Sequence, residues 1–195
     1  MQRIECLRAI YPRIEDSLVV TIMGAVAAEM QSLGHRPGFF YLQHAMGLAS
    51  STGLGLALSV PDEKVIVFDG DGSVLMNLGG FTTLARYRPR NLVHVIFDNE
   101  SLLSVGGFPT ATSTGSDLEG IARAAGIAKT ATVRTVEEFA AAFEEAMRAN
   151  ELSCIVAKVE AAGPKVFVTD LGLLENRFAF AREVERRRQK RGIGS

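Results

Sequence analysis

The sequence predicts an α/β fold in which helices cover both faces of a doubly wound parallel sheet. Short apolar runs rich in β-branched residues recur along the chain, and stretches with helical spacing separate them. Strands buried on both faces read as unbroken apolar runs, and helices of this length between strands are typical of βαβ units. A chain of 195 residues with 47% hydrophobic residues is long and apolar enough to bury such a core.

Four unbroken apolar runs are the predicted strands of the sheet: residues 18–23, 65–68, 92–97 and 153–159. Helices are expected between them, where apolar residues recur at helical spacing. These helices cover residues 2–10, 24–33, 43–58, 76–87, 117–125 and 135–147.

Local signals set the ends and the packing of several helices. Pro12 ends the first helix because proline cannot continue the backbone hydrogen-bond pattern. Thr135 and Glu138 form a capping box at the start of the last one. The stretch 43–58 is rich in Gly, Ala and Ser, which favours a helix packed very closely against its neighbours. A long loop is expected up to about residue 115, and loops of that length in compact domains are commonly functional.

Residues 1–165 are expected to form one domain and residues 166–195 a C-terminal helical extension. Five apolar residues of the extension fall near one helix face: Leu171, Leu173, Leu174, Phe178 and Val184. Six basic residues make it cationic: Arg182, Arg186, Arg187, Arg188, Lys190 and Arg191. Two interpretations stay open, a solvated terminal helix and a helix that docks onto an acidic partner surface. Nucleic-acid binding is disfavoured because no aromatic residues interleave to stack on bases.

The overall charge gives no reason to expect nucleic acid or an anionic membrane as a partner. The chain has 21 basic and 22 acidic residues, for a net charge of −1. No apolar run reaches the roughly 18–20 residues that a membrane helix needs, and charged residues interrupt positions 1–16, where a signal peptide would have its apolar core. Cys6 and Cys154 show no metal-ligand spacing. The expectation is a cytoplasmic protein with reduced thiols.

Polar residues follow two of the predicted strands directly. The first group is Gly70-Asp71-Gly72-Ser73. Glycines let the backbone approach a ligand closely, and backbone N–H groups at a helix start favour an anion. A carboxylate between these glycines would repel a phosphate unless a divalent cation lies between them, and Mg²⁺ is commonly shared between carboxylates and phosphates. The alternative for Asp71 is a helix N-cap worth about 1 kcal/mol, which explains neither the glycines nor the second group.

The second group is Asp98-Asn99-Glu100-Ser101. It supplies further oxygen ligands, and one βαβ unit separates it from the first group. Ligands of open parallel sheets bind beyond the carboxyl ends of the strands. The two groups together therefore predict a metal–diphosphate site at this edge of the sheet.

The pattern resembles the motif of thiamine diphosphate enzymes, and the likeness extends beyond it. Residues 40–57 look like the stretch that precedes the motif in the decarboxylase branch. Residues 70–78 and 98–110 are similar to sulfopyruvate and phosphonopyruvate decarboxylases, and the small-subunit organisation resembles the β subunit of sulfopyruvate decarboxylase. The likeness covers about residues 1–160. It implies the thiamine diphosphate-binding fold, with thiamine diphosphate and Mg²⁺ as cofactors.

The resemblance implies roles for the residues of both groups. Asp71 and Asn99 would bind Mg²⁺ through side-chain oxygens, and Ser101 would bind it through its backbone carbonyl. Gly70 belongs to the same motif, and Gly72 and Ser73 would donate to the diphosphate.

The resemblance also implies contacts outside the two groups. Met46 would hold the cofactor in its bent conformation, and Leu102 and Leu103 would pack beside it. His44 lies where a backbone carbonyl meets the aminopyrimidine; its imidazole is a candidate catalytic group or, alternatively, an ordinary loop histidine. Gly24 should border the diphosphate, although Ala25 and Val26 replace polar residues often found after it.

In enzymes of this kind a second domain holds the pyrimidine ring and supplies a glutamate that promotes proton loss from the thiazolium carbon. Nothing in the 195 residues resembles that domain. The resemblance therefore implies a separate pyrimidine-binding, α-type subunit that carries the activating glutamate, a hetero-oligomer, and a small 2-oxo acid as substrate. No certain catalytic residue is expected in this chain.

The leading hypothesis is the β-type subunit of a 2-oxo acid decarboxylase, a carboxy-lyase active only with its partner. Sulfopyruvate and phosphonopyruvate are the substrates of the similar enzymes. Val105 and Phe108 stand where those enzymes commonly have Thr and Gln, which favours a less polar acid if these positions face the substrate. The alternatives are an acetolactate synthase-like carboligase subunit, a subunit of the electron-transferring oxidoreductase branch, and a non-catalytic thiamine diphosphate-binding protein.

Overall fold

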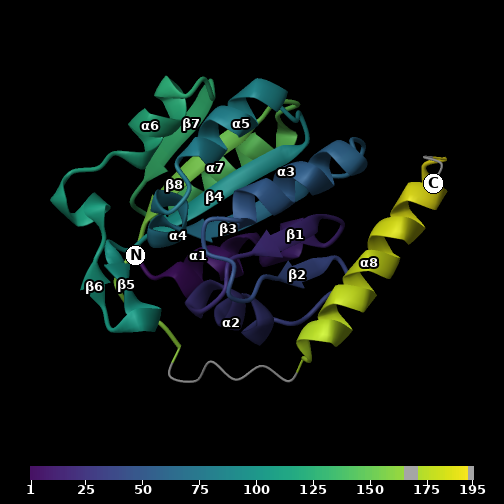
Figure 1. Cartoon of the computed structure of the whole chain (residues 1–195), viewed down its shortest axis with the longest axis horizontal. Helices are drawn as coiled ribbons and strands as arrows, with labels where there is room; N and C mark the ends of the chain where they lie inside the picture. The colour runs from purple at the N-terminus through teal and green to yellow at the C-terminus, as the bar shows by residue number, and fades with distance from the viewer. Residues whose placement is uncertain (165–170, 193–195) are drawn as a thin grey trace.

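A computed structural model describes residues 1–164 and 171–192 of the chain, and it is built around one parallel sheet (Figure 1). The strand order is β2-β1-β3-β4-β8-β7, with every neighbouring pair parallel. The strands of this sheet are β1 (Leu18–Thr21), β2 (Phe39–Tyr41), β3 (Val65–Gly70), β4 (Leu92–Asp98), β7 (Lys129–Val133) and β8 (Ser153–Lys158). A small antiparallel pair lies apart, formed by β5 (Ser101–Leu102) and β6 (Phe108–Pro109). The predicted doubly wound α/β fold is confirmed.

Helices cover both faces of the sheet. The α-helices are α1 (Arg3–Ile10), α2 (Ala25–Ser32), α3 (Ala49–Ser59), α4 (Asp71–Leu75), α5 (Gly79–Tyr87), α6 (Leu118–Ala124), α7 (Val136–Arg148) and α8 (Leu173–Lys190). Short 3₁₀ turns are η1 (Tyr11–Ile14), η2 (Leu103–Val105) and η3 (Ala111–Thr114). One layer contains α3, α5 and α6, and the other contains α1, α2 and α7, while α4 lies at the carboxyl ends of the strands (Figure 1).

The core on the α7 face is aromatic. Phe68 of β3 stacks on Phe97 of β4 with ring centroids 6.0 Å apart and on Phe143 of α7 at 6.5 Å. Phe139 completes the group, 5.9 Å from Phe97. Offset aromatic pairs at such distances add to the burial of the rings. These rings lie directly beneath the strands whose ends carry the polar groups, and they hold those ends rigidly.

The four central strands were predicted correctly, whereas the two edge strands β2 and β7 were not predicted. The expected helix 43–58 begins only at Ala49, because the side chains of Ser73 and Asn77 bond to the backbone of Gly47 and hold residues 43–48 as a loop. The Gly47 N–H donates to Ser73 Oγ at 3.0 Å, and the Asn77 amide donates to the Gly47 carbonyl at 2.8 Å. The expected helix 76–87 is α5, which begins at Gly79, and the short helix α4 that precedes it at Asp71–Leu75 was not predicted.

The C-terminal helix α8 lies along the β2 edge of the sheet (Figure 1). Asn176 pairs with that edge, since its Oδ1 accepts from the Tyr41 N–H at 3.0 Å and its Nδ2 donates to the Phe39 carbonyl at 2.8 Å. The ring of Phe180 stacks on Phe40 with centroids 5.1 Å apart. The helix is therefore anchored by both polar and apolar contacts.

The predicted apolar face of α8 is wrong in part. Leu171 and Val184 pack against the core, but Leu173, Leu174 and Phe178 are exposed. Asn176 and Phe180 form the buried side of α8, because the side-chain amide of Asn176 bonds to backbone groups on the outer edge of β2. The expected domain boundary near residue 166 lies outside the described residues and stays a prediction. Within the described part of the chain, no helix combines the length and apolarity needed to cross a membrane.

Two glycines of α3 give opposite expectations for stability. Helix α3 approaches β3 so closely that a Cβ on Gly53 would overlap the Val67 side chain, whereas a Cβ on Gly55 would meet no atom within 4 Å. We expect Gly53→Ala to lower the free energy of unfolding by about 1–3 kcal/mol through overpacking. Gly55→Ala should raise it by about 0.5–1 kcal/mol, because alanine reduces the entropy lost on folding. Urea denaturation of both variants measures this, and equal effects would contradict the close packing of α3.

Candidate functional site

A cavity opens at the carboxyl ends of β1, β3 and β4. The chain leaves β1 toward β2 on one side and returns to β3 on the other, so the cavity lies where the strand order reverses. Such switch points are where open α/β sheets bind ligands. Residues from the three strand ends line it together with Arg3, Met46, Leu102, Leu103 and Ser104.

The cavity brings together all but one of the predicted site residues. Those that line it are Gly24, Met46, Gly70, Asp71, Gly72, Ser73, Asn99, Ser101, Leu102 and Leu103. They come from the β1–α2 and β2–α3 connections, from the junction of β3 with α4, and from the segment 99–103 after β4, which are far apart in sequence. His44 is the exception, because it is exposed, does not line the cavity and has a left-handed backbone with φ of 51°. Their assignment to a cofactor and a metal stays a prediction.

Asp71 is a buried carboxylate held by hydroxyl groups. Thr110 Oγ1 donates to Asp71 Oδ2 at 2.5 Å, and Thr112 Oγ1 lies 3.2 Å from the same oxygen. Burial raises the pKa of Asp71 above its ordinary value, and the neighbouring Asp98 adds to the rise, while the Thr110 hydrogen bond opposes it. In the described part of the chain no side chain donates to Oδ1. Oδ1 is therefore the oxygen of Asp71 that remains available to a ligand.

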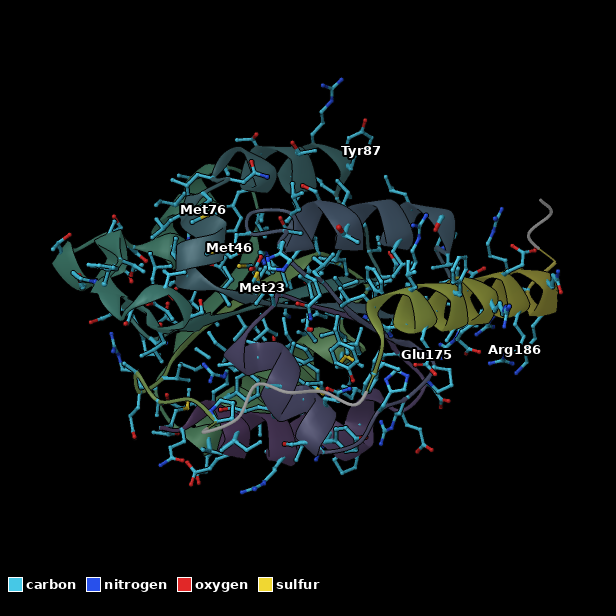
Figure 2. All side chains as sticks on the ribbon, turned by 60° about the horizontal axis from the view of Figure 1, so that its bottom comes forward. Met23, Met46, Met76, Tyr87, Glu175 and Arg186 are labelled. Carbon is cyan, nitrogen blue, oxygen red and sulfur yellow. The ribbon has the colours of Figure 1, made fainter. Side chains whose placement is uncertain are left out.

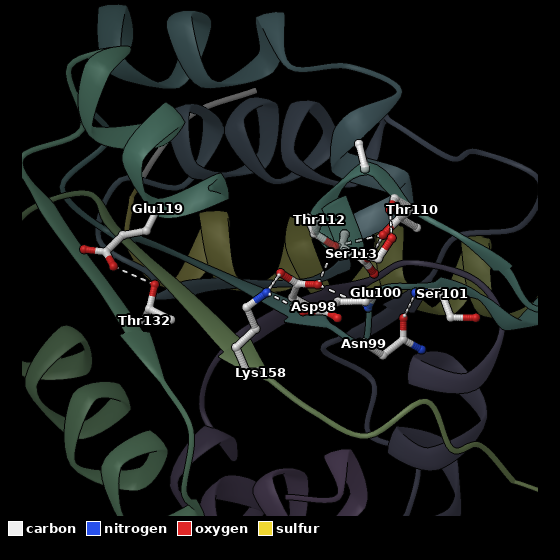
Figure 3. A network of polar contacts seen from close by, with 12 residues as sticks. Asp98, Asn99, Glu100, Ser101, Thr110, Thr112, Ser113, Glu119, Thr132 and Lys158 are labelled. Carbon is white, nitrogen blue, oxygen red and sulfur yellow. Dashed lines mark hydrogen bonds and ion pairs between the residues drawn. The ribbon is translucent and has the colours of Figure 1, made fainter. Parts of the chain in front are cut away.

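Asp98 extends this network on the other side of the threonines (Figure 3). Thr112 Oγ1 donates to Asp98 Oδ1 at 2.8 Å, and Lys158 Nζ lies 2.7 Å from Asp98 Oδ2. Lys158 also pairs with Glu100 at 3.0 Å. The two buried carboxylates are thus kept apart by hydroxyl donors, and one of them has an ammonium partner. Sequence reasoning missed Thr110 and Thr112 as positioning groups, because hydroxyl residues are common in loops and no spacing links them to Asp71.

The β4–β5 turn directs oxygen atoms toward the cavity. Asn99 Oδ1 accepts from the Ser101 N–H at 3.1 Å, and Asp98 Oδ1 accepts from the Glu100 N–H at 3.2 Å (Figure 3). These side-chain turns mimic backbone turns and allow Glu100 to adopt a left-handed φ of 59°. The result is that Asn99 and Ser101 both line the cavity.

Glycine at position 72 leaves room for a neighbouring side chain. A Cβ there would overlap the Leu102 side chain, which lines the same cavity. The adjacent Ser73 hydroxyl accepts from the Gly47 N–H at 3.0 Å, so its own proton remains for a ligand. Met23 and Met46, labelled in Figure 2, also line the cavity and contribute flexible apolar surface.

Arg3 is a cavity residue that sequence reasoning missed. It lies on α1, far in sequence from both polar groups, and no spacing rule links that helix to them. Its guanidinium is buried and forms a bidentate pair with Glu29 of α2, at 2.8 Å and 2.9 Å. Arg3 and Asp71 are the two charged residues among those that line the cavity in the described part of the chain.

The chemistry of the donors suits a hard cation. Asp71, Asn99 and Ser101 offer a carboxylate, an amide oxygen and a carbonyl, the kind of oxygen set that Mg²⁺ takes with phosphates. Clusters of three or more His, Cys, Asp and Glu suited to a metal are absent from the described residues. Cys6 and Cys154 are buried, and burial raises the pKa of their thiols to about 11 and about 12, so both are inert.

The part of the sequence that forms most of this cavity matches a known protein family. Residues 23–157 match the family described as thiamine pyrophosphate enzyme, C-terminal TPP binding domain. The matched range contains every predicted cofactor and metal residue, and it excludes Arg3.

Individual relatives carry the same likeness. The chain is 40% identical over 158 residues to the sulfopyruvate decarboxylase subunit beta of Methanocaldococcus jannaschii, covering 80% of this chain and 83% of that one. It is 44% identical over 123 residues to the phosphonopyruvate decarboxylase of Streptomyces viridochromogenes, covering 63% of this chain and 30% of that one. These two relatives confirm the resemblance that the motifs predicted.

Solved structures show the same fold. The benzoylformate decarboxylase of Polynucleobacter necessarius superposes with a TM-score of 0.70 at 21% sequence identity, over 85% of this chain and 34% of that one. At this identity the likeness supports the fold alone. The chain spans about a third of that enzyme.

The raised pKa of Asp71 predicts a pH-dependent effect on the metal-free protein. A carboxyl whose folded pKa lies above its unfolded value destabilises the fold as pH rises past the ordinary Asp range. In EDTA, Asp71→Asn should therefore be more stable than the parent chain at pH 7, and the difference should shrink as pH falls toward 4. Thermal unfolding at both pH values measures this, with exposed Asp62→Asn as the control. A pH-independent difference would contradict the burial of an ionised Asp71.

Proposed function

This chain belongs to the thiamine pyrophosphate enzymes, as their C-terminal TPP-binding domain, and we propose that it is the diphosphate- and Mg²⁺-binding, β-type subunit of a heteromeric 2-oxo acid decarboxylase. The observation that carries the proposal is the single cavity at the ends of β1, β3 and β4. It gathers ten of the eleven predicted cofactor and metal residues. The named relatives of the chain are decarboxylases.

The residues of the cavity fit thiamine diphosphate with Mg²⁺. Asp71 would bind the metal through Oδ1, because Thr110 and Thr112 occupy Oδ2. Asn99 and the Ser101 carbonyl supply further oxygens. A cation here would also offset the buried charge of Asp71, which no base among the described residues pairs with. The Gly72 N–H and the Ser73 hydroxyl would donate to the diphosphate.

When bound, thiamine diphosphate supplies the nucleophilic carbon and the electron sink that loss of CO₂ from a 2-oxo acid requires. The chain's own residues bind and orient the cofactor. Met46, Leu102 and Leu103 line the cavity as apolar walls and exclude water from it. Threonine hydroxyls hold Asp71 in one orientation, so that the metal and the diphosphate are fixed relative to those walls. None of these groups moves a proton, which leaves that task to the partner.

A second subunit is supported by what the cavity contains. Among the described residues that line it, Asp71 is the carboxylate and no glutamate is present. The relative from M. jannaschii is named a subunit beta, and the match covers only 30% of the phosphonopyruvate decarboxylase. Leu103, Val105 and Phe108 are exposed on the segment beside the cavity and offer apolar surface to a partner. We propose that this partner holds the pyrimidine ring and supplies the activating glutamate.

Co-expression tests the assignment. The chain should be produced with a pyrimidine-domain subunit from the same genome and assayed for CO₂ release from sulfopyruvate, phosphonopyruvate and less polar 2-oxo acids. We expect release only with both subunits, thiamine diphosphate and Mg²⁺. Full activity of this chain alone would contradict the two-subunit proposal. Condensation of two 2-oxo acids into an acetohydroxy acid would instead identify a carboligase.

Asp71→Ala tests the metal ligand. Calorimetric titration with thiamine diphosphate should show no Mg²⁺-dependent binding in the variant, because its cavity lacks the one ionised ligand. Circular dichroism should show an intact fold, and exposed Asp62→Ala should bind as the parent does. Retained Mg²⁺-dependent affinity in Asp71→Ala would refute the ligand assignment.

A further inference from the structure

Arg3 has an unusual place for a surface-helix residue. It lies in the first turn of α1, yet its side chain is only 4% exposed and it lines the cavity formed by the strand ends. It also lies outside residues 23–157, the range that matches the family. The motif residues therefore do not account for this part of the cavity wall.

The hydrogen bonds of Arg3 leave one nitrogen free. Nε donates to Glu29 Oε2 at 2.8 Å, and Nη2 donates to Glu29 Oε1 at 2.9 Å and to the Ala162 carbonyl at 3.0 Å. A guanidinium has five N–H donors. These three bonds leave the two donors of Nη1, which have no hydrogen-bond partner among the described residues. The pair with Glu29 fixes the plane of the group and so presents Nη1 in a fixed direction.

The cavity needs a cation on this side to hold a polyanion. The neighbouring wall consists of Met23 and Gly24 from the β1–α2 connection and of Ala25 and Val26 from the first turn of α2, and none of these residues has a side chain that can donate a hydrogen bond. A buried ion pair that served packing alone would gain little, because well-packed apolar residues often replace such pairs at no cost. A pair with one nitrogen left over at a cavity wall provides a positive group at a defined position.

We propose that Arg3 is a diphosphate-binding residue of this chain, that it acts through Nη1, and that Glu29 is its positioning residue. The inference rests on the proposed function, since the anion is the diphosphate of the cofactor. Guanidinium groups bind phosphate oxygens by charge-assisted hydrogen bonds and remain charged at all working pH values. Arg3 then supplies the side-chain donor that residues 23–26 lack.

The test is calorimetric titration of the full chain, alone and with its co-expressed partner. The probes are inorganic diphosphate with Mg²⁺ and thiamine diphosphate with Mg²⁺. The double variant Arg3→Met with Glu29→Met removes the guanidinium without leaving an unpaired buried charge. We expect it to bind both probes about tenfold more weakly or worse. Arg13→Met is the matched control, because it removes an exposed arginine that pairs with Glu144 on the surface.

A second variant separates binding from structure. Glu29→Gln keeps the Arg3 cation but loses the bidentate contact that orients it, so the affinity for inorganic diphosphate should fall, though less than in the double variant. A purely structural pair would leave diphosphate affinity unchanged in the double variant, and that result would overturn the inference. So would an effect limited to the KM of the 2-oxo acid, because the anion bound by Arg3 would then be the substrate.

The same titrations distinguish this inference from the proposed function. If the parent chain with its partner does not bind thiamine diphosphate with Mg²⁺, the proposed function fails and the role of Arg3 fails with it. If the parent binds and the double variant binds equally well, only the role of Arg3 is refuted.

Discussion

The structure depends on the parallel alignment of three adjacent strands whose carboxyl ends meet at one edge. Because β1, β3 and β4 run in the same direction, the segments that follow them must emerge together, although they lie far apart in the sequence. The aromatic rings of Phe68, Phe97, Phe139 and Phe143 hold the strand ends against α7. Rigid support below the site lets short turns above it carry all the polar groups.

The cost of this arrangement is a negative charge in a region with little water. Asp71 is buried between two glycines, and its neighbour Asp98 is buried as well. Hydroxyl groups of Thr110 and Thr112 stabilise both without neutralising either. Asp98 has Lys158 as its partner, whereas Asp71 has no base beside it among the described residues, and under the proposed function a divalent cation would offset its charge. The segment 98–112 then has two tasks, since it would supply metal ligands and it holds both carboxylates.

Much of this was predictable from the sequence, and the rest was not, for physical reasons. Central strands are buried on both faces, so their unbroken apolar runs identified them. The edge strand β7 (KTATV) lacks such a run, and β2 is only three residues long. The clustering of the motif residues could be predicted, because strand ends and turns are determined by residues that are neighbours in the sequence. Thr110, Thr112 and Arg3 reach the site through tertiary packing, which no spacing rule encodes. The start of α3 was predicted too early, because the side chains of Ser73 and Asn77 hold residues 43–48 out of the helix.

The contact between Asn176 and β2 limits how other chains can add to the sheet. An exposed sheet edge invites a further strand from another chain, whether a proper partner or an aggregating copy. Here a side-chain amide takes the place of that strand, since it satisfies one N–H and one carbonyl of β2 while α8 covers the rest of the edge. Recruitment by strand addition is closed at this side. Another chain that binds on this side must therefore contact α8 or the strand-end loops, and β7 is the edge of the sheet that α8 leaves uncovered.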